Sequence, residues 1–252
     1  MNEATPEAFR TPRLRIGMAV YGDLTYDSRV QREAETISAA GHRVMLACLP
    51  GHDPMQWSPA GVSVLPLLPH RTSTLPGTPV LKASHTSRRR PPILSRLGWL
   101  TSYIANLQEW GSEVARAIGS VDAWHLHDLT ALSAISPHVP KGVPIVYDSH
   151  ELFLDTGAPA SLPSPLRTIL RAEEARRVRR ADTLITVNDE LASILGRRYR
   201  PRRIVVIHNC PPRAVPRQGP DRIRAATGIA TDEPVIVHHG CLLYTSPSPR
   251  DS

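Results

Sequence analysis

Residues 121–151 read VDAWHLHDLTALSAISPHVPKGVPIVYDSHE, and this stretch decides the fold. Two short apolar runs in it each end in histidine and carboxylate residues. These are His125, His127 and Asp128 after the first run, and Asp148, His150 and Glu151 after the second. Apolar runs of this length, bounded by polar residues, are typical of buried parallel strands. Ligands bind beyond the carboxyl ends of such strands, so the sequence predicts two strands whose polar ends share one site.

The chain on either side alternates segments that favour strands with segments that favour helices. The stretch RIGMAVY (15–21) predicts the first strand, and a helix is expected between Ser28 and Gly41 because Val30, Ala34 and Ile37 fall on one face. Further strands are expected at 43–49, 62–68, 182–187, 204–208 and 234–239, and helices at 93–118, 162–180, 190–199 and 221–227. This alternation predicts an α/β fold with a doubly wound, mainly parallel sheet.

Composition limits the classes of protein to which the chain can belong. Of its 252 residues 41% are hydrophobic, enough for a core, and no window approaches the ~20 apolar residues of a membrane span. The polar start of the chain shows no signal peptide. The three cysteines have no paired spacing, which favours a reducing compartment, so we expect a cytoplasmic location.

The net charge of +7 is concentrated in residues 161–213, which contain twelve arginines and five acidic residues. Such a segment predicts contact with an anionic partner, and we expect peripheral binding at the inner face of a membrane. The alternative is a solvated, arginine-rich helix face. Nucleic acid is not expected as a partner, because aromatic residues are not interleaved with the arginines.

Several motifs together resemble a known family. They are DSRVQREAETISAAGHRV (27–44), WHLHD (124–128), YDSHEL (147–152), ADTLITVNDELA (181–192), VVIHNCP (205–211) and PVIVHHG (234–240). In this order they resemble the N-terminal domain of family 4 glycosyltransferases, enzymes of the GT-B fold with two Rossmann-like domains. The resemblance covers roughly residues 14–240.

The resemblance implies a domain division for this chain. Residues 1–13 are expected to be disordered, and residues 14–210 to form the Rossmann-like N-terminal domain with a mobile loop at 70–92. Residues 211–240 correspond to a linker and the first strand of a truncated second domain. The tail 241–252, CLLYTSPSPRDS, resembles the translation of a sequencing-library adapter, so we expect it to be artefactual.

The resemblance also implies an activity. Members of the family with a retaining mechanism move a sugar from a nucleotide-diphosphate sugar to an acceptor, here expected to be a glycan or lipid-linked molecule. No cofactor is expected beyond this donor. The second domain of the family binds the donor through two glutamates separated by seven residues, and no glutamates here have that spacing. The donor-binding residues are therefore unknown, and we expect the chain alone to be inactive.

Two alternatives from other classes remain at this point. One is a non-catalytic Rossmann-like module that binds a sugar or a phosphate. The other is a flavodoxin-like or dehydrogenase domain, against which the absence of a G-x-G-x-x-G motif after the first strand counts.

The family pattern gives His127 the central role, because it matches the second histidine of the His-x-His strand end that faces the reacting sugar. Acceptor contacts are expected from Gly22, Asp27, Arg29, Asp128, His150 and Glu151. The alternatives are a helix cap for Asp27 and for Asp128, a tight turn that requires glycine at Gly22, a surface position for Arg29 and a buried structural role for His127. No metal site is expected, because Leu129 stands where binuclear hydrolases have a further histidine.

Overall fold

The computed structural model describes residues 12–51, 57–69, 93–160, 162–210, 219 and 221–236. The chain divides into two compact units, Met1–Asn209 and Cys210–Ser252. The first unit contains the sheet and every candidate site residue. In the second, the described residues form the short helix α7 (Arg222–Thr227), which begins after Asp221 and ends at Gly228.

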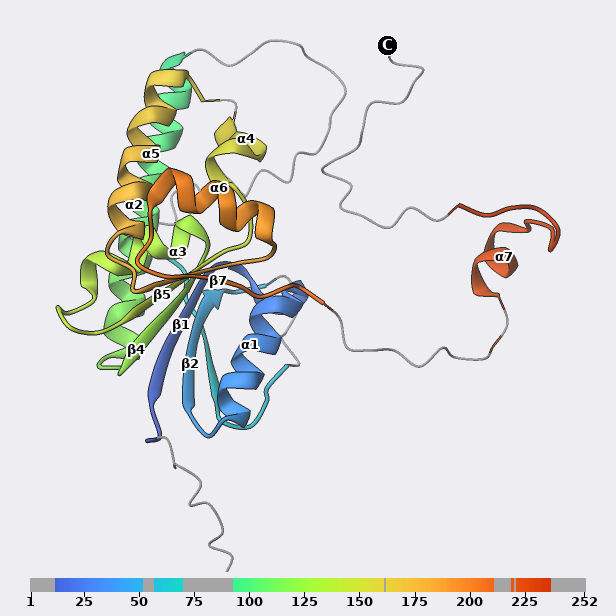
Figure 1. Ribbon diagram of the computed structural model, residues 1–252, viewed down its shortest axis with the longest axis horizontal. Helices are drawn as coiled ribbons and strands as arrows, with labels where there is room; N and C mark the ends of the chain where they lie inside the picture. Colours follow the sequence, from blue (N-terminus) through green and yellow to red (C-terminus); the bar gives the residue numbers. More distant parts are fainter. Residues whose placement is uncertain are drawn as a thin grey trace, which may run out of the picture. The chain divides into compact units, whose positions relative to one another are not determined.

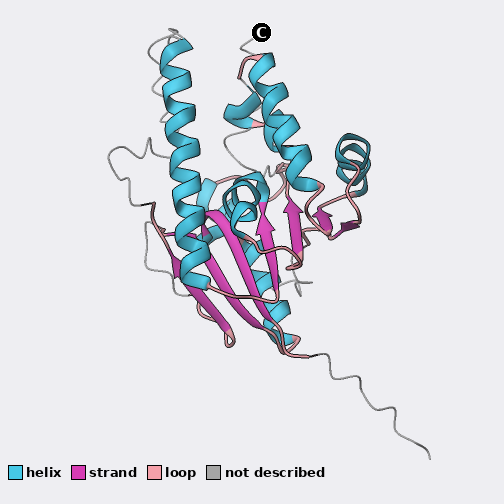
Figure 2. Cartoon of the chain, turned by 90° about the vertical axis from the view of Figure 1, so that its left-hand side faces the viewer, coloured by secondary structure: helices cyan, strands magenta, loops and turns pink. Residues whose placement is uncertain are grey.

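The first unit is built on seven parallel strands in the order β3-β2-β1-β4-β5-β6-β7 (Figures 1 and 2). The strands are β1 (Arg15–Asp23), β2 (Arg43–Leu49), β3 (Val62–Pro66), β4 (Ala123–His127), β5 (Ile145–Ser149), β6 (Thr183–Thr186) and β7 (Ile204–Val206). The strand order reverses between β1 and β4, which is where open parallel sheets bind ligands. The predicted α/β, doubly wound parallel sheet is confirmed.

Helices cover both faces of this sheet. They are α1 (Ser28–Ala39), α2 (Ile93–Ile118), α3 (Asp128–Ile135), α4 (Gly157–Ala160), α5 (Ser164–Val178) and α6 (Asp189–Tyr199). One core cluster joins Val30 and Ala34 of α1 to Met18 of β1. The other joins α2 and α3 to the opposite side, and Figure 2 shows α2 lying along the sheet.

Trp110 anchors α2 to the sheet. Its side chain is fully buried, its ring meets the ring of Tyr21 edge-on at 5.1 Å between centroids, and its Nε1 donates a hydrogen bond to the carbonyl oxygen of Leu67 at 3.0 Å. A buried tryptophan needs such a partner for its N–H group. This contact fixes the position of α2 relative to the chain that leaves β3.

The predicted elements differ from the observed ones mainly at their ends. Strand β1 runs two residues past Tyr21, so Gly22 lies inside the strand and not after it. The strand predicted at 234–239 is not found in residues 234–236, and the rest of it lies outside the described residues. The predicted loop 70–92, the tail 241–252 and residues 1–11 of the N-terminal segment also lie outside them. Within the described residues, no helix is long and apolar enough to cross a membrane.

Candidate functional site

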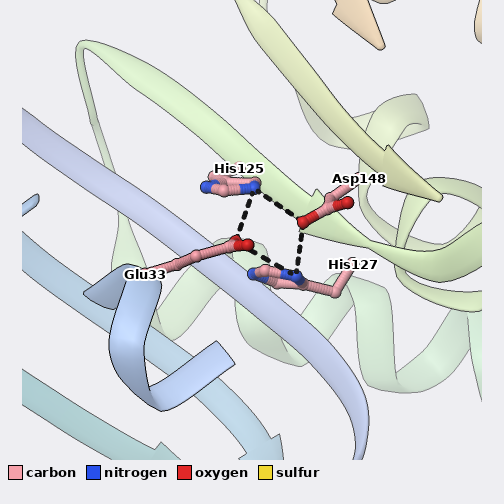
Figure 3. A group of neighbouring side chains, drawn as sticks. All are labelled: Glu33, His125, His127 and Asp148. Atoms are coloured by element: carbon pink, nitrogen blue, oxygen red, sulfur yellow. Dashed lines mark ion pairs between the residues drawn. The ribbon is translucent and has the colours of Figure 1, made fainter. Parts of the chain in front are cut away.

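The ends of β4 and β5 bring the two polar motifs together, as predicted. The strands are neighbours, and their register places His127 directly opposite Asp148. His125 lies two residues before His127, so both side chains lie on the same face of the sheet, the face that α1 covers. Figure 3 shows Glu33 of α1 reaching toward these three side chains.

Arg29 and Asp148 form a buried ion pair at the base of this cluster. Nη2 of Arg29 lies 3.0 Å from Oδ1 and 2.9 Å from Oδ2 of Asp148, and Nε lies 3.1 Å from Oδ2. Nη1 donates to the carbonyl oxygen of Ile207 at 2.9 Å. Arg29 is only 5% exposed, so the surface position considered from the sequence is wrong. In this conformation the guanidinium is used within the protein, and an acceptor contact by Arg29 stays a prediction.

Glu33 belongs to the cluster although the sequence motifs did not indicate it. Its Oε2 lies 3.4 Å from Nε2 of His125 and 3.9 Å from Nδ1 of His127, and its Oε1 lies 3.1 Å from Nε of Arg29. Burial, followed by the charge of Asp148, raises the pKa of Glu33 to about 8. The four-residue spacing from Arg29, one turn along α1, is the signal that indicates it.

His127 lies at the end of the sheet, as predicted, but its side chain is 0% exposed. Its ring stacks on the ring of His125 at 4.5 Å between centroids, and its Nδ1 lies 3.4 Å from Nε2 of His150. Burial, followed by the charge of His125, lowers the pKa of His127 well below its usual value, so the ring is neutral. Its contacts are with neighbouring side chains, and contact with a sugar stays a prediction.

His150 and Asp128 form the outer part of the cluster, with side chains 21% and 29% exposed. Nδ1 of His150 lies 3.6 Å from Oδ2 of Asp128, and the backbone N–H of His150 donates to Oδ1 at 3.4 Å. Burial works against a charge on His150, but its contact with Asp148 and the charge of Asp128 outweigh it and raise the pKa to about 9. The partly exposed imidazole is therefore protonated at neutral pH.

Asp128 has an unusual backbone conformation. Its φ of 60° turns the chain from β4 directly into α3, and aspartate is one of the few residues that tolerates this region. His127 precedes α3 and its side chain makes no capping hydrogen bond, and the carboxylate of Asp128 is directed at His150. Burial raises the pKa of Asp128. Non-glycine residues in this conformation occur often at functional sites, and an acceptor contact by Asp128 stays a prediction.

The other predicted acceptor residues lie near the cluster with simpler environments. Asp27 caps α1, because its side chain accepts a hydrogen bond from the N–H of Val30 at 3.1 Å. A Cβ atom on Gly22 would meet only the Val20 side chain at 3.9 Å, so space does not require a glycine there. Glu151 is half-buried after β5, and its carbonyl oxygen accepts from the hydroxyl of Ser149 at 3.0 Å. Acceptor contacts by all three stay predictions.

The stability of the fold is expected to fall by about 2 kcal/mol between pH 6.5 and pH 9, which corresponds to a difference of about half a proton between the folded and unfolded states over this window. Glu33 and His150 have folded-state pKa values of about 8 and 9, both above their unfolded values. The folded state therefore binds more protons than the unfolded state between pH 6.5 and pH 9, and stability is lost as these protons leave. Below pH 6.5 the buried His127 offsets the effect of Glu33, because only the unfolded state protonates this histidine.

The measurement is urea unfolding followed by circular dichroism across this range, in buffers containing EDTA. Glu33→Gln is the matched variant, because an amide resembles the protonated acid and does not titrate. It is expected to reduce the slope. A stability that rises from pH 6.5 to pH 9 would contradict the pKa directions given for Glu33 and His150.

A family model described as Glycosyltransferase Family 4 matches residues 28–211. The chain belongs to this family. The match includes α1, both site strands, β6 and β7, and thus every element that holds the cluster. No curated protein matches the chain.

Solved structures that resemble the chain share little sequence with it. A sucrose-phosphate synthase from Thermosynechococcus elongatus is 13% identical with a TM-score of 0.47, covering 78% of this chain and 48% of its own. A calicheamicin glycosyltransferase is 12% identical with a TM-score of 0.49, and the match covers 81% of this chain and 56% of that protein. A transferase from Siraitia grosvenorii in complex with UDP is 10% identical with a TM-score of 0.43, and the match covers 77% of this chain and 50% of that protein. The chain spans about half the length of these proteins.

Proposed function

We propose that this chain is the acceptor-binding part of a retaining glycosyltransferase, which moves a sugar from a nucleotide-diphosphate sugar to a glycan or lipid-linked acceptor. The observation that carries the proposal is the histidine–carboxylate cluster at the ends of β4 and β5, within the segment that matches the family. The cluster lies beside the point where the strand order reverses, at which parallel sheets bind ligands.

The outer pair of the cluster has the chemistry that an acceptor hydroxyl requires. The protonated His150 offers N–H donors, and the carboxylate of Asp128, 3.6 Å from it, offers acceptors. A sugar hydroxyl both donates and accepts, so this pair can hold one hydroxyl in a fixed direction. Holding the nucleophile in place is a large part of the rate enhancement in a two-substrate transfer.

The inner part of the cluster supports the outer pair. Asp148 lies 3.6 Å from Nε2 of His150 on the side opposite Asp128, and Arg29 holds Asp148 in place. The imidazole therefore lies between two carboxylates, which fixes both its charge and its orientation. His127 contacts the same nitrogen of His150 at 3.4 Å, and we propose that it faces the sugar after a small movement of His150.

His150→Ala is expected to weaken acceptor binding about tenfold, since it removes one charge-assisted hydrogen bond worth about 1.5 kcal/mol. The measurement is titration calorimetry with a panel of simple sugars and with a polyprenyl-diphosphate-linked sugar in detergent micelles. His138→Ala, at an exposed position at the end of the 3-10 helix Ser136–His138, is the matched control and is expected to leave binding unchanged.

The same titration separates the transferase from the alternative function. Binding of a sugar acceptor without binding of UDP supports the acceptor-binding role, and this chain alone is then expected to transfer no sugar. Binding of inorganic phosphate or UDP at the His150 site, with no binding of sugars, would contradict the proposal and favour a non-catalytic phosphate module.

We also propose that the chain is cytoplasmic and touches an anionic membrane through residues of the 161–213 segment. Most described arginines of this segment have partners within the protein. Arg171 and Arg198 pair with Asp155, Arg176 and Arg177 with Glu173, and Arg202 with Asp182. Hydrogen bonds are donated within the protein by Arg167, Arg180 and Arg197. In the described part of the segment, Arg179, Arg200 and Arg203 are exposed and have no such partner. These three are the candidates for a membrane contact.

The test is vesicle sedimentation with a chosen composition of about 30% anionic phospholipid. The chain is expected to sediment with these vesicles and not with neutral vesicles. Each arginine near an anionic surface contributes about 1 kcal/mol, so reversal of Arg200 and Arg203 to glutamate is expected to reduce binding at least tenfold. Arg116→Glu, on the end of α2, is the control charge reversal. Equal sedimentation with neutral and anionic vesicles would remove this part of the proposal.

A further inference from the structure

We propose that His150 is a positioning residue for His127. Its Nε2–H group donates a hydrogen bond to Nδ1 of His127 and holds that ring as the neutral tautomer that carries its proton on Nε2. His127 is the last residue of β4, and His150 directly follows β5. The inference rests on the proposed function, in which both rings belong to the acceptor site, and adds which atoms of His127 donate and which accept.

The two rings meet through one nitrogen each. Nδ1 of His127 lies 3.4 Å from Nε2 of His150, and the ring centroids lie 5.5 Å apart with an angle of 60° between the ring planes. Two imidazole nitrogens form a hydrogen bond only when one carries a proton and the other has a free lone pair. One of the two rings is therefore the donor, and the surroundings of each ring decide which one.

His150 is the donor because it lies between two carboxylates. Its Nδ1 lies 3.6 Å from Oδ2 of Asp128, and its Nε2 lies 3.6 Å from Oδ2 of Asp148. An opposite charge close to each nitrogen favours a proton on both. Burial lowers the pKa of His150, but the contact with Asp148 and the charge of Asp128 outweigh burial and raise the pKa to about 9. Nε2 of His150 thus carries a proton that it can donate.

His127 is the acceptor because its ring does not hold a second proton at neutral pH. The residue is 0% exposed, and its ring stacks on the ring of His125 at 4.5 Å between centroids. Burial, followed by the charge of His125, lowers the pKa of His127 well below its usual value, and the charges of His150 and Arg29 act in the same direction. The ring is neutral, so it carries one proton and one lone pair.

The groups that face Nδ1 of His127 decide where this one proton lies. Besides His150, they are Oδ2 of Asp148 at 3.7 Å and Oε2 of Glu33 at 3.9 Å. Both distances exceed the length of a hydrogen bond, about 2.7–3.2 Å. Oδ2 of Asp148 also accepts two hydrogen bonds from Arg29 already, at 3.1 Å and 2.9 Å. A proton on Nδ1 would point at the N–H group of His150, so the proton lies on Nε2.

This arrangement makes Nε2 of His127 a buried N–H group. It has no hydrogen-bond partner among the described residues. A buried donor without a partner costs free energy and is rare, so its presence requires an explanation. The hydrogen bond from His150 supplies one, because it holds the proton on Nε2 and directs the lone pair of Nδ1 toward the acceptor site.

The tautomer determines which ligand atom His127 can bind. When His150 turns toward an acceptor, Nδ1 of His127 faces the site with a free lone pair. A sugar hydroxyl can donate to this lone pair in place of His150, whereas an ionised phosphate oxygen has only lone pairs of its own. His127 is thus expected to accept a hydrogen bond from a hydroxyl-bearing acceptor and to disfavour a phosphate.

Nitrogen NMR of the tag-free chain, labelled with the 15N isotope in its histidines and measured at neutral pH without ligand, tests the tautomer. A ring nitrogen with a lone pair resonates far from one that carries a proton, and the correlations to the ring protons Hδ2 and Hε1 distinguish Nδ1 from Nε2. The signals are assigned by their loss in His127→Gln and His150→Gln. His127 is expected to show a lone pair on Nδ1 and a proton on Nε2, and His150 a proton on both nitrogens. A proton on Nδ1 of His127 in the main form, with or without one on Nε2, would overturn the proposal.

Two substitutions of His150 separate a positioning role from a purely structural one. The amide of His150→Gln keeps an N–H donor, so the proton of His127 is expected to stay on Nε2. His150→Leu removes the donor, and the proton is expected to shift to Nδ1, which faces Asp148. His138→Ala, at an exposed position, is the control and is expected to leave the signals of His127 unchanged.

Unchanged His127 signals in folded His150→Leu would also overturn the proposal. If His150→Leu does not fold, the spectra of the unchanged chain and of His150→Gln still decide the position of the proton. These spectra contain no ligand, whereas the acceptor titrations measure only binding. The tautomer and the proposed function can therefore fail independently of each other.

Discussion

Replacing Asp148 with alanine is expected to lower the free energy of unfolding by about 3–5 kcal/mol, the cost of breaking a buried ion pair from one side. The reason is the environment of Arg29, whose side chain is 6% exposed and has Asp148 as its bidentate partner. After the substitution the guanidinium stays charged in the same buried place, with the carbonyl oxygen of Ile207 and the side chain of Glu33 as its remaining partners. The loss is thus mainly the cost of keeping a charge buried without its bidentate partner.

Urea unfolding in EDTA measures this effect, with two comparisons. Arg202→Ala breaks an ion pair with Asp182 whose side chains are 66% and 44% exposed, so it is expected to cost less than about 1 kcal/mol. The double variant Arg29→Met with Asp148→Leu removes both charges and is expected to recover most of the loss. A cost below about 1 kcal/mol for Asp148→Ala would contradict this, and would show that Glu33 alone compensates the charge of Arg29.

The sequence predicted the sheet and its polar edge because both follow from local patterns. Apolar runs that end in His127 and Asp148 are short enough to be strands, and the segment between them is too short to place the strands far apart. It follows that β4 and β5 are neighbours in the sheet and that His127 lies opposite Asp148. The period of two along β4 likewise places His125 on the same face as His127.

The partners of these residues did not follow from the sequence, because they depend on how α1 is rotated against the sheet. Asp27 and Arg29 were predicted as candidates from the opening of the helix, but nothing local shows that Arg29 and Glu33 face the strand ends. The apolar positions Val30 and Ala34 fix the buried face of α1, and Arg29 and Glu33 each directly precede one of them. In the sequence, this arrangement is indicated by a pair of opposite charges, Arg29 and Glu33, that lie one helical turn apart at the border of the buried face.

Gly111 is a second position whose role becomes visible only in the folded protein. From the sequence it is a weak point in a long helix, because glycine costs about 1 kcal/mol relative to alanine in a helix interior. In the structure a Cβ atom at Gly111 would lie 2.2 Å from the carbonyl oxygen and 2.6 Å from the carbonyl carbon of Ala134. The glycine therefore allows the backbones of α2 and α3 to touch.

Gly111→Ala is expected to lower the free energy of unfolding by about 3 kcal/mol, at the upper end of the cost of overpacking. The atom in the way belongs to the backbone of α3 and cannot rotate aside, so one helix must move. Moving α2 also disturbs Trp110, whose indole N–H donates to Leu67. The gain in helix propensity is about 1 kcal/mol and is outweighed.

Gly196→Ala in α6 is the matched control, because a Cβ atom there meets nothing within 4 Å. The same substitution is expected to raise the free energy of unfolding by about 0.5–1 kcal/mol at this position. Urea unfolding measures both changes in the free energy of unfolding. If the same substitution destabilises the protein at position 111 and stabilises it at position 196, then the contact between α2 and α3, and not helix propensity, requires glycine at position 111. If Gly111→Ala stabilised the protein as Gly196→Ala does, the close approach of α2 and α3 would be wrong. The placement of α3, which follows directly from Asp128 of the candidate site, would then have to change with it.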